Sequence, residues 1–242
     1  MLTRLTPRLV PKVWGSTHLQ PWYPNAAEKI GEVWFESDPR PPLLVKFLFT
    51  TENLSVQVHP EGKTEMWHIL AAEQGAKIAA GFREPITEQR LRESALSGEI
   101  EELLEWFEAR PGDTFFIPAG TVHAIGAGLT LCEIQQHSDI TYRLFDYGRP
   151  RELHLDEGAR VSKLGRHAAR QNGREGVLVS CPFFTTEKIR LNGRTRVEVG
   201  RMVVVLDGSF TIGGQTTRAG EAWHADGRAV ELQGQGTVLV VS

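Results

Sequence analysis

Turn-forming residues interrupt this sequence so often that they limit the length of every helix and strand it can form. The 242 residues include 24 glycines and 13 prolines. Glycine favours turns and proline lacks an amide hydrogen, so both residue types break regular backbone structure. We therefore expect many short elements joined by turns, in a chain long enough for one large or two small hydrophobic cores.

The charge balance excludes several classes of protein. The chain has 27 lysines and arginines against 30 acidic residues, a net charge of −3, so it lacks the positive surplus of a nucleic-acid or membrane-surface binder. Its 40% hydrophobic content excludes a disordered chain. We find no signal-peptide core and no membrane-length apolar run, and Cys132 and Cys181 do not make a disulfide framework. These features predict a cytoplasmic protein with no nucleic-acid or membrane partner.

Short apolar or alternating segments predict strands in two parts of the chain. In the first part these segments are 43–49, 54–58, 66–72, 76–81, 114–117 and 129–135. In the second part they are 183–191, 196–206, 209–212 and 236–241, with a turn expected at Asp207-Gly208. The pattern predicts a mainly β protein built from barrels or sandwiches of the jelly-roll kind.

One stretch between these strands has the period of a helix. Apolar residues recur there at steps of three and four: Leu91, Ala95, Leu96, Ile100, Leu103, Leu104 and Phe107. Thr87 is the expected N-cap, and Ser97-Gly98 is expected to split the stretch into two short helices. We therefore divide the chain into a β domain over 1–150 with a helical insertion at about 85–109, a polar connector over 151–180, and a smaller β domain over 181–242.

Four residues of the first domain have the chemistry of a metal site. Gln57 and His59 are two apart on a predicted strand, so their side chains leave the same face. A turn returns the chain to Glu65, and a Pro- and Gly-containing turn precedes His123. Two imidazoles, a carboxylate and an amide oxygen suit Zn²⁺ or another divalent first-row metal. The spacing alone leaves open that these are ordinary hydrogen-bonded side chains.

Four sequence motifs extend this hypothesis, because in this order they resemble the type I phosphomannose isomerases, metal-dependent mannose-6-phosphate isomerases of the cupin superfamily. The fourth motif is the most specific. They are Leu54-Ser-Val-Gln-Val-His-Pro60, Gly62-Lys-Thr-Glu-Met-Trp67, Gly112-Asp-Thr-Phe-Phe-Ile-Pro-Ala-Gly-Thr-Val-His-Ala-Ile-Gly126 and Glu133-Ile-Gln-Gln-His-Ser-Asp-Ile-Thr-Tyr-Arg-Leu-Phe-Asp-Tyr147.

The resemblance implies a fold, a cofactor and a reaction. The fold would be a metal-bearing cupin with a helical insertion, followed by a degenerate cupin-like unit. The reaction would interconvert mannose 6-phosphate and fructose 6-phosphate by proton transfer through an enediolate, in a monomer or homodimer. One Zn²⁺ would bind to Gln57, His59, Glu65 and His123, and Lys63, Glu133 and Arg143 would be the catalytic polar residues.

The roles of individual pocket residues are less constrained. Either Glu133 or Lys63 could exchange the proton, and Arg143 could bind phosphate or stabilise developing charge. Ser55, on the strand face of the ligands, and Trp14 are expected to contact substrate.

Two features keep other readings open. His59 and Glu65 are only six residues apart, whereas a longer segment usually separates the corresponding residues in the family, so a free sugar could replace the phosphorylated one. Two histidines and a carboxylate also form the facial triad of Fe(II) oxygenases, and a non-enzymatic sugar-binding cupin would keep the same pocket.

In the second β unit, Ala219-Gly-Glu-Ala-Trp-His224 resembles the strand that ends in His123, but no Gln-x-His partner precedes it.

Overall fold

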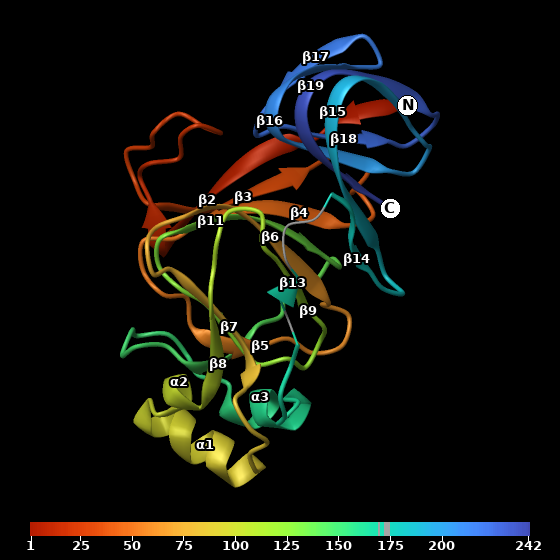
Figure 1. The fold of residues 1–242 in the computed structure, drawn as a ribbon. Coiled ribbons are helices and arrows are strands. Elements are labelled where there is room, and N and C mark those ends of the chain that lie inside the picture. The colour runs from red at the N-terminus through yellow and green to blue at the C-terminus, as the bar shows by residue number, and fades with distance from the viewer. Residues whose placement is uncertain (169, 172–174) are drawn as a thin grey trace.

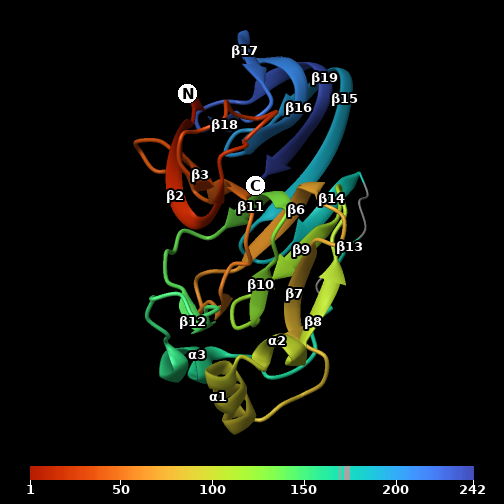
Figure 2. The ribbon, with the colours of Figure 1, turned by 90° about the vertical axis from the view of Figure 1, so that its left-hand side faces the viewer.

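The computed structural model describes residues 1–168, 170–171 and 175–242. Three antiparallel sheets follow one another down the long axis of the molecule, with three short helices at the far end (Figure 1). Seen from the side, the C-terminal sheet lies at one end and the helices at the other (Figure 2). The fold is therefore mainly β, as the sequence predicts, and its sheets do not close into complete barrels.

The central sheet and the five-stranded sheet opposite it form the part of the molecule for which the sequence predicts a cupin, called the cupin part from here on. The seven-stranded central sheet has the order β13-β9-β6-β11-β4-β3-β2. Its strands are β2 (Thr6–Ser16), β3 (Ile30–Glu36), β4 (Leu44–Phe49), β6 (Glu65–Ala72), β9 (Thr114–Ile117), β11 (Leu129–Gln135) and β13 (Arg170–Gln171). Opposite it, the five-stranded sheet has the order β12-β5-β10-β7-β8. Its strands are β5 (Val56–Val58), β7 (Lys77–Phe82), β8 (Leu104–Glu108), β10 (His123–Ile125) and β12 (Tyr142–Phe145).

The C-terminal sheet covers the other face of the central sheet. Its strands are β1 (Leu2–Arg4), β14 (Gly176–Ser180), β15 (Thr185–Val197), β16 (Met202–Ile212), β17 (Gln215–Arg218), β18 (Ala222–Ala225) and β19 (Val230–Val241). The first strand of the chain, β1, pairs with β18 in this sheet. Side chains from both sheets, among them Phe47, Ile134 and Leu239, form one continuous core.

The central sheet is buried on both faces, and the alternation of side chains along its strands places core residues on one face and pocket residues on the other. On β11, Cys132 and Ile134 belong to the core shared with the C-terminal sheet, whereas Glu133 lines a pocket on the opposite face. On β4, Phe47 lies in that shared core and Lys46 faces the pocket. Successive strand residues point to opposite faces, so one strand supplies both a core and a site.

The helical insertion forms mostly as predicted. Helix α1 (Glu88–Ser97) is capped by Thr87, whose hydroxyl accepts from the Arg90 amide at 3.1 Å, and Gly98 ends it with φ 86°. Helix α2 (Ile100–Leu103) follows, but the predicted continuation to Phe107 is wrong. Residues from Leu104 form β8 instead, because pairing with β7 satisfies their backbone groups and overrides the helical spacing. A third helix, α3 (Leu155–Val161), lies in the connector and packs near β12.

The turn predicted at Asp207-Gly208 is also wrong. Strand β16 runs through these residues, and the chain turns earlier, between β15 and β16. Gly208 has φ +82°, and a Cβ there would lie 2.1 Å from the Gln235 carbonyl oxygen. Gly208 lies opposite Gly236 on β19, and the register with β19 shifts just before it, between Val205 and Asp207, so Leu206 is the bulged residue.

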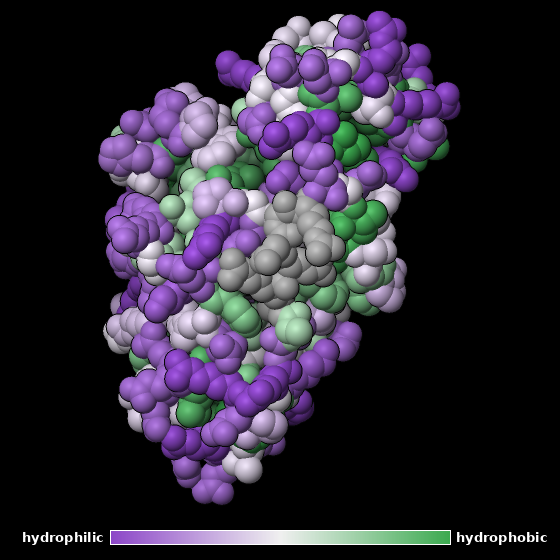
Figure 3. All heavy atoms as spheres, in the orientation of Figure 1, coloured by the Kyte–Doolittle hydropathy of each residue, from purple (hydrophilic) through white to green (hydrophobic). Residues whose placement is uncertain are grey.

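Hydrophilic and hydrophobic residues are distributed unevenly over the surface. On the face shown in Figure 3, hydrophilic residues cover much of the helical end, and hydrophobic residues appear in separate patches. Among the described residues, no helix is both long and apolar enough to cross a membrane. The division of the chain at residues 150 and 180 stays a prediction.

Candidate metal centre and its pocket

Three buried side chains from different elements meet between the two cupin sheets. His59 follows β5, Glu65 begins β6 and His123 begins β10. Glu65 lies between the two imidazoles, with Oε2 at 3.5 Å from His59 Nε2 and Oε1 at 3.6 Å from His123 Nε2. One ligand atom from each of the three lies within 4.8 Å of the others. The turn after His59 is thus long enough to bring Glu65 back to the same point.

Backbone carbonyls determine which nitrogen of each imidazole is free. His59 Nδ1 donates to the Ile140 carbonyl at 3.1 Å, and His123 Nδ1 donates to the Thr121 carbonyl at 2.8 Å. Carbonyls only accept, so Nε2 of each ring keeps its lone pair and faces Glu65. Burial lowers the pKa of His123 to about 4, and burial with the nearby Lys63 charge holds the pKa of His59 well below its ordinary value. Both rings are therefore neutral at pH 7 and able to bind a metal.

The Glu65 carboxylate has no hydrogen-bond donor within the described residues. Its side chain is 1% exposed, and both oxygens are buried without a hydrogen-bond partner. A bare carboxylate facing two nitrogen lone pairs is costly to bury, and each such group calls for a specific explanation. A divalent cation among these atoms would satisfy all of them at once, so the residues present fit a metal of mixed nitrogen and oxygen ligation.

Gln57 and Ser55 lie beside this cluster. His123 pairs with Gln57 across β10 and β5, and the Gln57 amide nitrogen is 3.3 Å from His123 Nε2. The Ser55 hydroxyl donates to Gln57 Oε1 at 3.0 Å. The cluster of three therefore has an amide group within reach, as the strand alternation predicts.

A pocket of about 320 Å³ opens beside the cluster. It brings together most of the residues singled out in the sequence, while Glu65 and His123 lie outside its lining. Those that line it are Trp14, Ser55, Gln57, His59, Lys63, Glu133 and Arg143. The positions of all nine candidate residues are thus consistent with one site, although their roles stay predictions.

Lys46 is a pocket residue that the sequence analysis missed. Its ammonium donates to Glu133 Oε1 at 2.8 Å and lies 4.7 Å from the Trp34 ring. Burial is the largest single influence and lowers the pKa of Lys46, but the charges of Glu133, Glu32 and Glu65 and the hydrogen bond to Glu133 together outweigh it, so the pKa is raised. The signal was present, because Lys46 is the single charged residue in the apolar run of β4. A lone lysine in a fully buried strand implies a buried partner.

Glu133 is held at both carboxylate oxygens. Besides the Lys46 contact at Oε1, Oε2 accepts from Trp67 Nε1 at 3.0 Å. In contrast, the only hydrogen bond of the Lys63 ammonium within the described part of the chain is to the Thr141 hydroxyl at 3.3 Å. Burial lowers the pKa of Lys63. The two candidate proton-transfer groups therefore differ in how strongly the protein already engages them.

Arg143 lies on β12 and pairs with Gln57 across the sheet. Its Nε donates to the Glu152 carbonyl at 3.1 Å. Asp146, three residues farther along the chain, forms ion pairs with Arg151, at 2.6 Å, and with Arg149, at 3.1 Å. The Arg143 guanidinium thus stays available at the pocket.

Comparison with known proteins gives relatives of one kind. No protein-family model matches the chain. A mannose-6-phosphate isomerase of Streptococcus mutans is 37% identical over 181 residues, covering 65% of this chain and 57% of that protein. One from Bacillus subtilis is 38% identical over 178 residues, covering 63% of this chain and 56% of that protein. The chain thus spans little more than half the length of these curated relatives.

The solved structures agree over the whole chain. The crystal structure of the mannose 6-phosphate isomerase from Bacillus subtilis has a TM-score of 0.84 and 26% identity, covering 99% of this chain and 98% of that one. A putative mannosephosphate isomerase from Archaeoglobus fulgidus has a TM-score of 0.81 at 19% identity, which supports the fold alone. In sequence and in fold the chain is therefore similar to mannose-6-phosphate isomerases.

Proposed function

We propose that this chain is a metal-dependent isomerase that interconverts mannose 6-phosphate and fructose 6-phosphate. The observation that carries the proposal is the buried Glu65 carboxylate, which has no hydrogen-bond partner among the described residues and lies between two neutral imidazoles beside a polar pocket. The names of the relatives support the same activity. The relatives compared give no support to an Fe(II) oxygenase or a non-catalytic sugar-binding protein.

The metal would be one Zn²⁺ per chain. His59, Glu65 and His123 would hold it, with Gln57 as the fourth ligand. A divalent cation supplies a Lewis acid that favours negative charge on the oxygens of an opened sugar. The Nδ1 hydrogen bonds of the two histidines support this arrangement, since they aim each Nε2 at the cluster.

Charge at the pocket favours a phosphorylated sugar over a neutral one. Five cationic side chains line it, against three carboxylates. The cations are Lys12, Lys46, Lys63, Arg143 and Arg151, and the acids are Glu32, Glu133 and Asp139. A dianionic phosphate complements this surplus, and a guanidinium binds phosphate oxygens in pairs. We assign Arg143 to the phosphate or to developing charge on the sugar, and Ser55 and Trp14 to contacts with the sugar.

Isomerisation requires one group to take a proton from C2 and return it to C1. We assign this role to Lys63 in its neutral amine form, because burial lowers its pKa and its Nζ has a single hydrogen bond among the described residues. Glu133 is the alternative, but its oxygens are engaged by Lys46 and Trp67. We propose that Glu133 instead keeps Lys46 in place.

The test combines metal analysis with activity. Purified protein should contain one zinc per chain and convert mannose 6-phosphate faster than free mannose, and a chelator should abolish conversion. In D₂O, Lys63→Met should lose exchange of the C2 proton while still binding the sugar phosphate. The exposed Lys77→Met is the matched control and should behave as the native protein. Failure of the zinc-loaded protein to exchange the C2 proton would exclude the isomerase. If Glu133→Gln lost this proton exchange and Lys63→Met kept it, Glu133 rather than Lys63 would be the proton-transfer group.

We also propose that the protein works in the cytoplasm as a monomer or homodimer. The proposed division is a metal-binding cupin domain over 1–150, a connector over 151–180 and a degenerate cupin-like domain over 181–242. The apolar interior of the last part, described below, supports a role in packing rather than catalysis.

A further inference from the structure

Gln135, the last residue of β11, makes three hydrogen bonds at the boundary between the pocket and a surface loop. The side chain is completely buried. Its Oε1 accepts from Lys46 Nζ at 2.6 Å. Its Nε2 donates to the carbonyl oxygens of Gln136 and Ser138, at 2.9 and 2.8 Å. Only an amide accepts at one end and donates twice at the other, so the position requires this chemistry.

The loop that Gln135 holds, residues 136–141, reaches the metal centre and the pocket at two points. The Ile140 carbonyl accepts from His59 Nδ1 at 3.1 Å. The Thr141 hydroxyl accepts from the Lys63 ammonium at 3.3 Å. A displacement of this loop would therefore disturb the orientation of one metal-site histidine and of one pocket lysine at the same time.

The remaining attachments of the loop leave its middle dependent on Gln135. At its start, Gln136 exchanges hydrogen bonds with Thr64, whose amide donates to Gln136 Oε1 at 3.0 Å. His137 Nε2 donates to the Pro41 carbonyl at 2.8 Å. Asp139 and Ile140 are exposed, and Ile140 is 47% accessible. On the N-terminal side of Ile140, the Gln135 Nε2 bond to the Ser138 carbonyl is thus the nearest tie to a buried side chain.

We propose that Gln135 is a positioning residue that couples the Lys46–Glu133 pair to the 136–141 loop and, through the Ile140 carbonyl, fixes His59 for metal binding. The coupling runs from Lys46 Nζ through the Gln135 amide to the Ser138 carbonyl, and then along the loop to His59. Partners that orient a metal-binding histidine tune metal affinity although they do not touch the metal. The inference rests on the proposed function only for the expected change in kcat.

Two substitutions separate the two ends of the amide. Gln135→Glu keeps the shape and the contact with Lys46, but it places a carboxylate oxygen against the carbonyls of Gln136 and Ser138, where it can only repel. Gln135→Met removes both ends while keeping a similar volume. Gln233→Glu introduces the same change at an exposed position on β19 and is the matched control.

The experiment measures metal affinity by titrating the metal-stripped chain with Zn²⁺, and it measures amide hydrogen exchange of residues 136–141. Gln135→Glu should weaken metal binding by roughly 10–100-fold and speed exchange in the loop, with exchange in β15–β19 unchanged. Gln135→Met should do the same, and the control should match the native chain. With sugar phosphate, kcat should fall in both variants and recover in part at saturating zinc.

The outcomes separate this inference from the proposed function. A folded Gln135→Glu chain with native zinc affinity and native loop exchange overturns the inference, even if its kcat is reduced. General destabilisation of Gln135→Met, without a change in zinc affinity of the folded chain, also overturns it, because that is the effect of a merely structural residue. Altered affinity and exchange in a protein without isomerase activity would support the inference and reject the proposed function.

Discussion

The cupin part and the C-terminal unit are both antiparallel β structures, yet their interiors differ completely. Between the cupin sheets, buried charged or polar side chains include Lys46, His59, Glu65, His123 and Glu133. Inside the C-terminal unit, a cluster of apolar residues that includes Val205, Phe210 and Leu232 fills the space. Antiparallel sheets thus enclose a polar pocket in the cupin part and an apolar core in the C-terminal unit.

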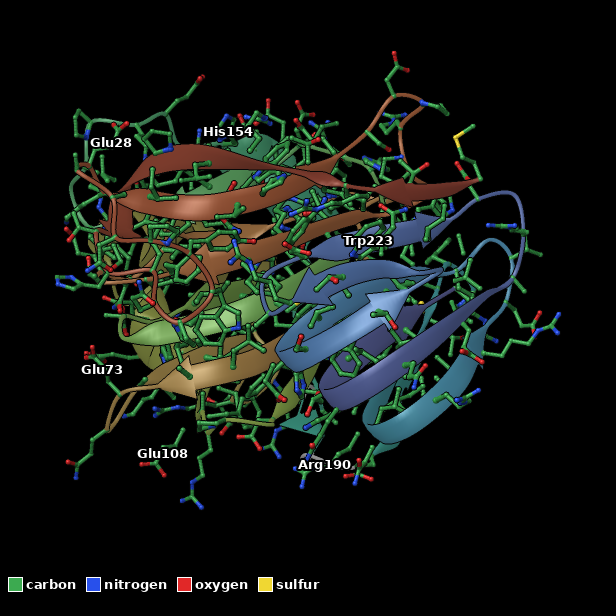
Figure 4. All side chains as sticks on the ribbon, turned by 90° about the horizontal axis from the view of Figure 1, so that it is seen from above. Glu28, Glu73, Glu108, His154, Arg190 and Trp223 are labelled. Carbon is green, nitrogen blue, oxygen red and sulfur yellow. The ribbon has the colours of Figure 1, made fainter. Side chains whose placement is uncertain are left out.

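The strand of the C-terminal unit that resembles the one before His123 illustrates the difference. On β18 the large buried side chain is that of Trp223, 1% exposed, and His224 beside it is half-buried. Trp223 Nε1 donates to the Thr217 hydroxyl at 2.8 Å, so its single polar atom is satisfied. Seen from above, Trp223 lies among the strands, whereas Glu28, Glu73, Glu108 and Arg190 lie at the periphery (Figure 4). Which residue of the strand points inward decides whether a pocket can form there.

The difference indicates that the polar interior of the cupin part lowers its free energy of unfolding. Buried carboxylates and ammonium groups are costly to desolvate, and the Glu65 carboxylate has no hydrogen bond among the described residues. The apolar cluster of the C-terminal unit contains no charged side chain, and this unit covers the back of the central sheet. Four changes would break or sharpen this contrast.

The largest effect is expected at Glu65. Replacement by Gln removes the buried charge, and the new amide can donate to the lone pairs of His59 and His123. We expect zinc binding at least on the order of 100-fold weaker, since even indirect partners change it by 10–100-fold, with isomerase activity lost. In the presence of a chelator, the variant should unfold at a higher urea concentration than the native chain, because its free energy of unfolding should be larger by roughly 1–3 kcal/mol.

Glu61→Gln, on the exposed turn before Glu65, is the control and should leave both zinc affinity and stability unchanged. Stoichiometric zinc retained by Glu65→Gln would show that this cluster is not the metal centre.

A large but different effect is expected at Trp223. Trp223→Ala leaves a cavity in the apolar cluster and should lower the free energy of unfolding by about 3–5 kcal/mol. The zinc affinity of the folded chain should not change, because the cavity lies on the far side of the central sheet. Urea titrations with and without zinc measure both quantities. A weaker zinc affinity in folded Trp223→Ala would mean that the two interiors are not independent.

A pH-dependent effect is expected at His68, which faces the C-terminal unit. Burial, with Lys188 nearby, lowers the pKa of His68 to about 3, against 6.5 for the free group. On acidification the unfolded chain therefore binds this proton before the folded chain does, so stability present above pH 6.5 is lost as the pH falls towards 3. Between pH 6.5 and 4.5, the native chain should lose roughly 1–3 kcal/mol more than His68→Gln.

Urea unfolding at the two pH values measures this difference. The exposed His18→Gln is the matched control and should follow the native chain. Equal losses in native protein and His68→Gln would contradict the buried neutral state of His68.

The smallest effect is expected where a cupin loop meets the C-terminal unit. Trp22 Nε1 donates to the Leu206 carbonyl at 2.8 Å. Trp22→Phe keeps an aromatic ring but removes this hydrogen bond, and should cost about 1 kcal/mol. Thermal and urea unfolding should still show a single transition, whereas two separate transitions would mean that the units fold independently.

Local features of the fold were predictable from sequence, and non-local ones were not. Thr87 and Gly98 act within one helix, so their roles as cap and terminator could be inferred directly. The strand formed by the residues from Leu104 onward depends on pairing with β7, and the close approach at Gly208 depends on β19. At the site, the alternation of Gln57 and His59 was predictable, whereas the partner of Lys46 lies 87 residues away.

The sequence by itself determined the class of the fold and supplied the hypothesis of a metal site. Short alternating segments specify strands because side chains alternate at every residue, and the types and spacing of His59, Glu65 and His123 suit a metal without requiring one. Only the tertiary structure decided that β1 pairs with β18 at the other end of the chain, and that Gln135 joins Lys46 to the loop beside His59. Such contacts join residues far apart in the chain, and their energies come from burial and pairing in three dimensions, which local spacing does not encode.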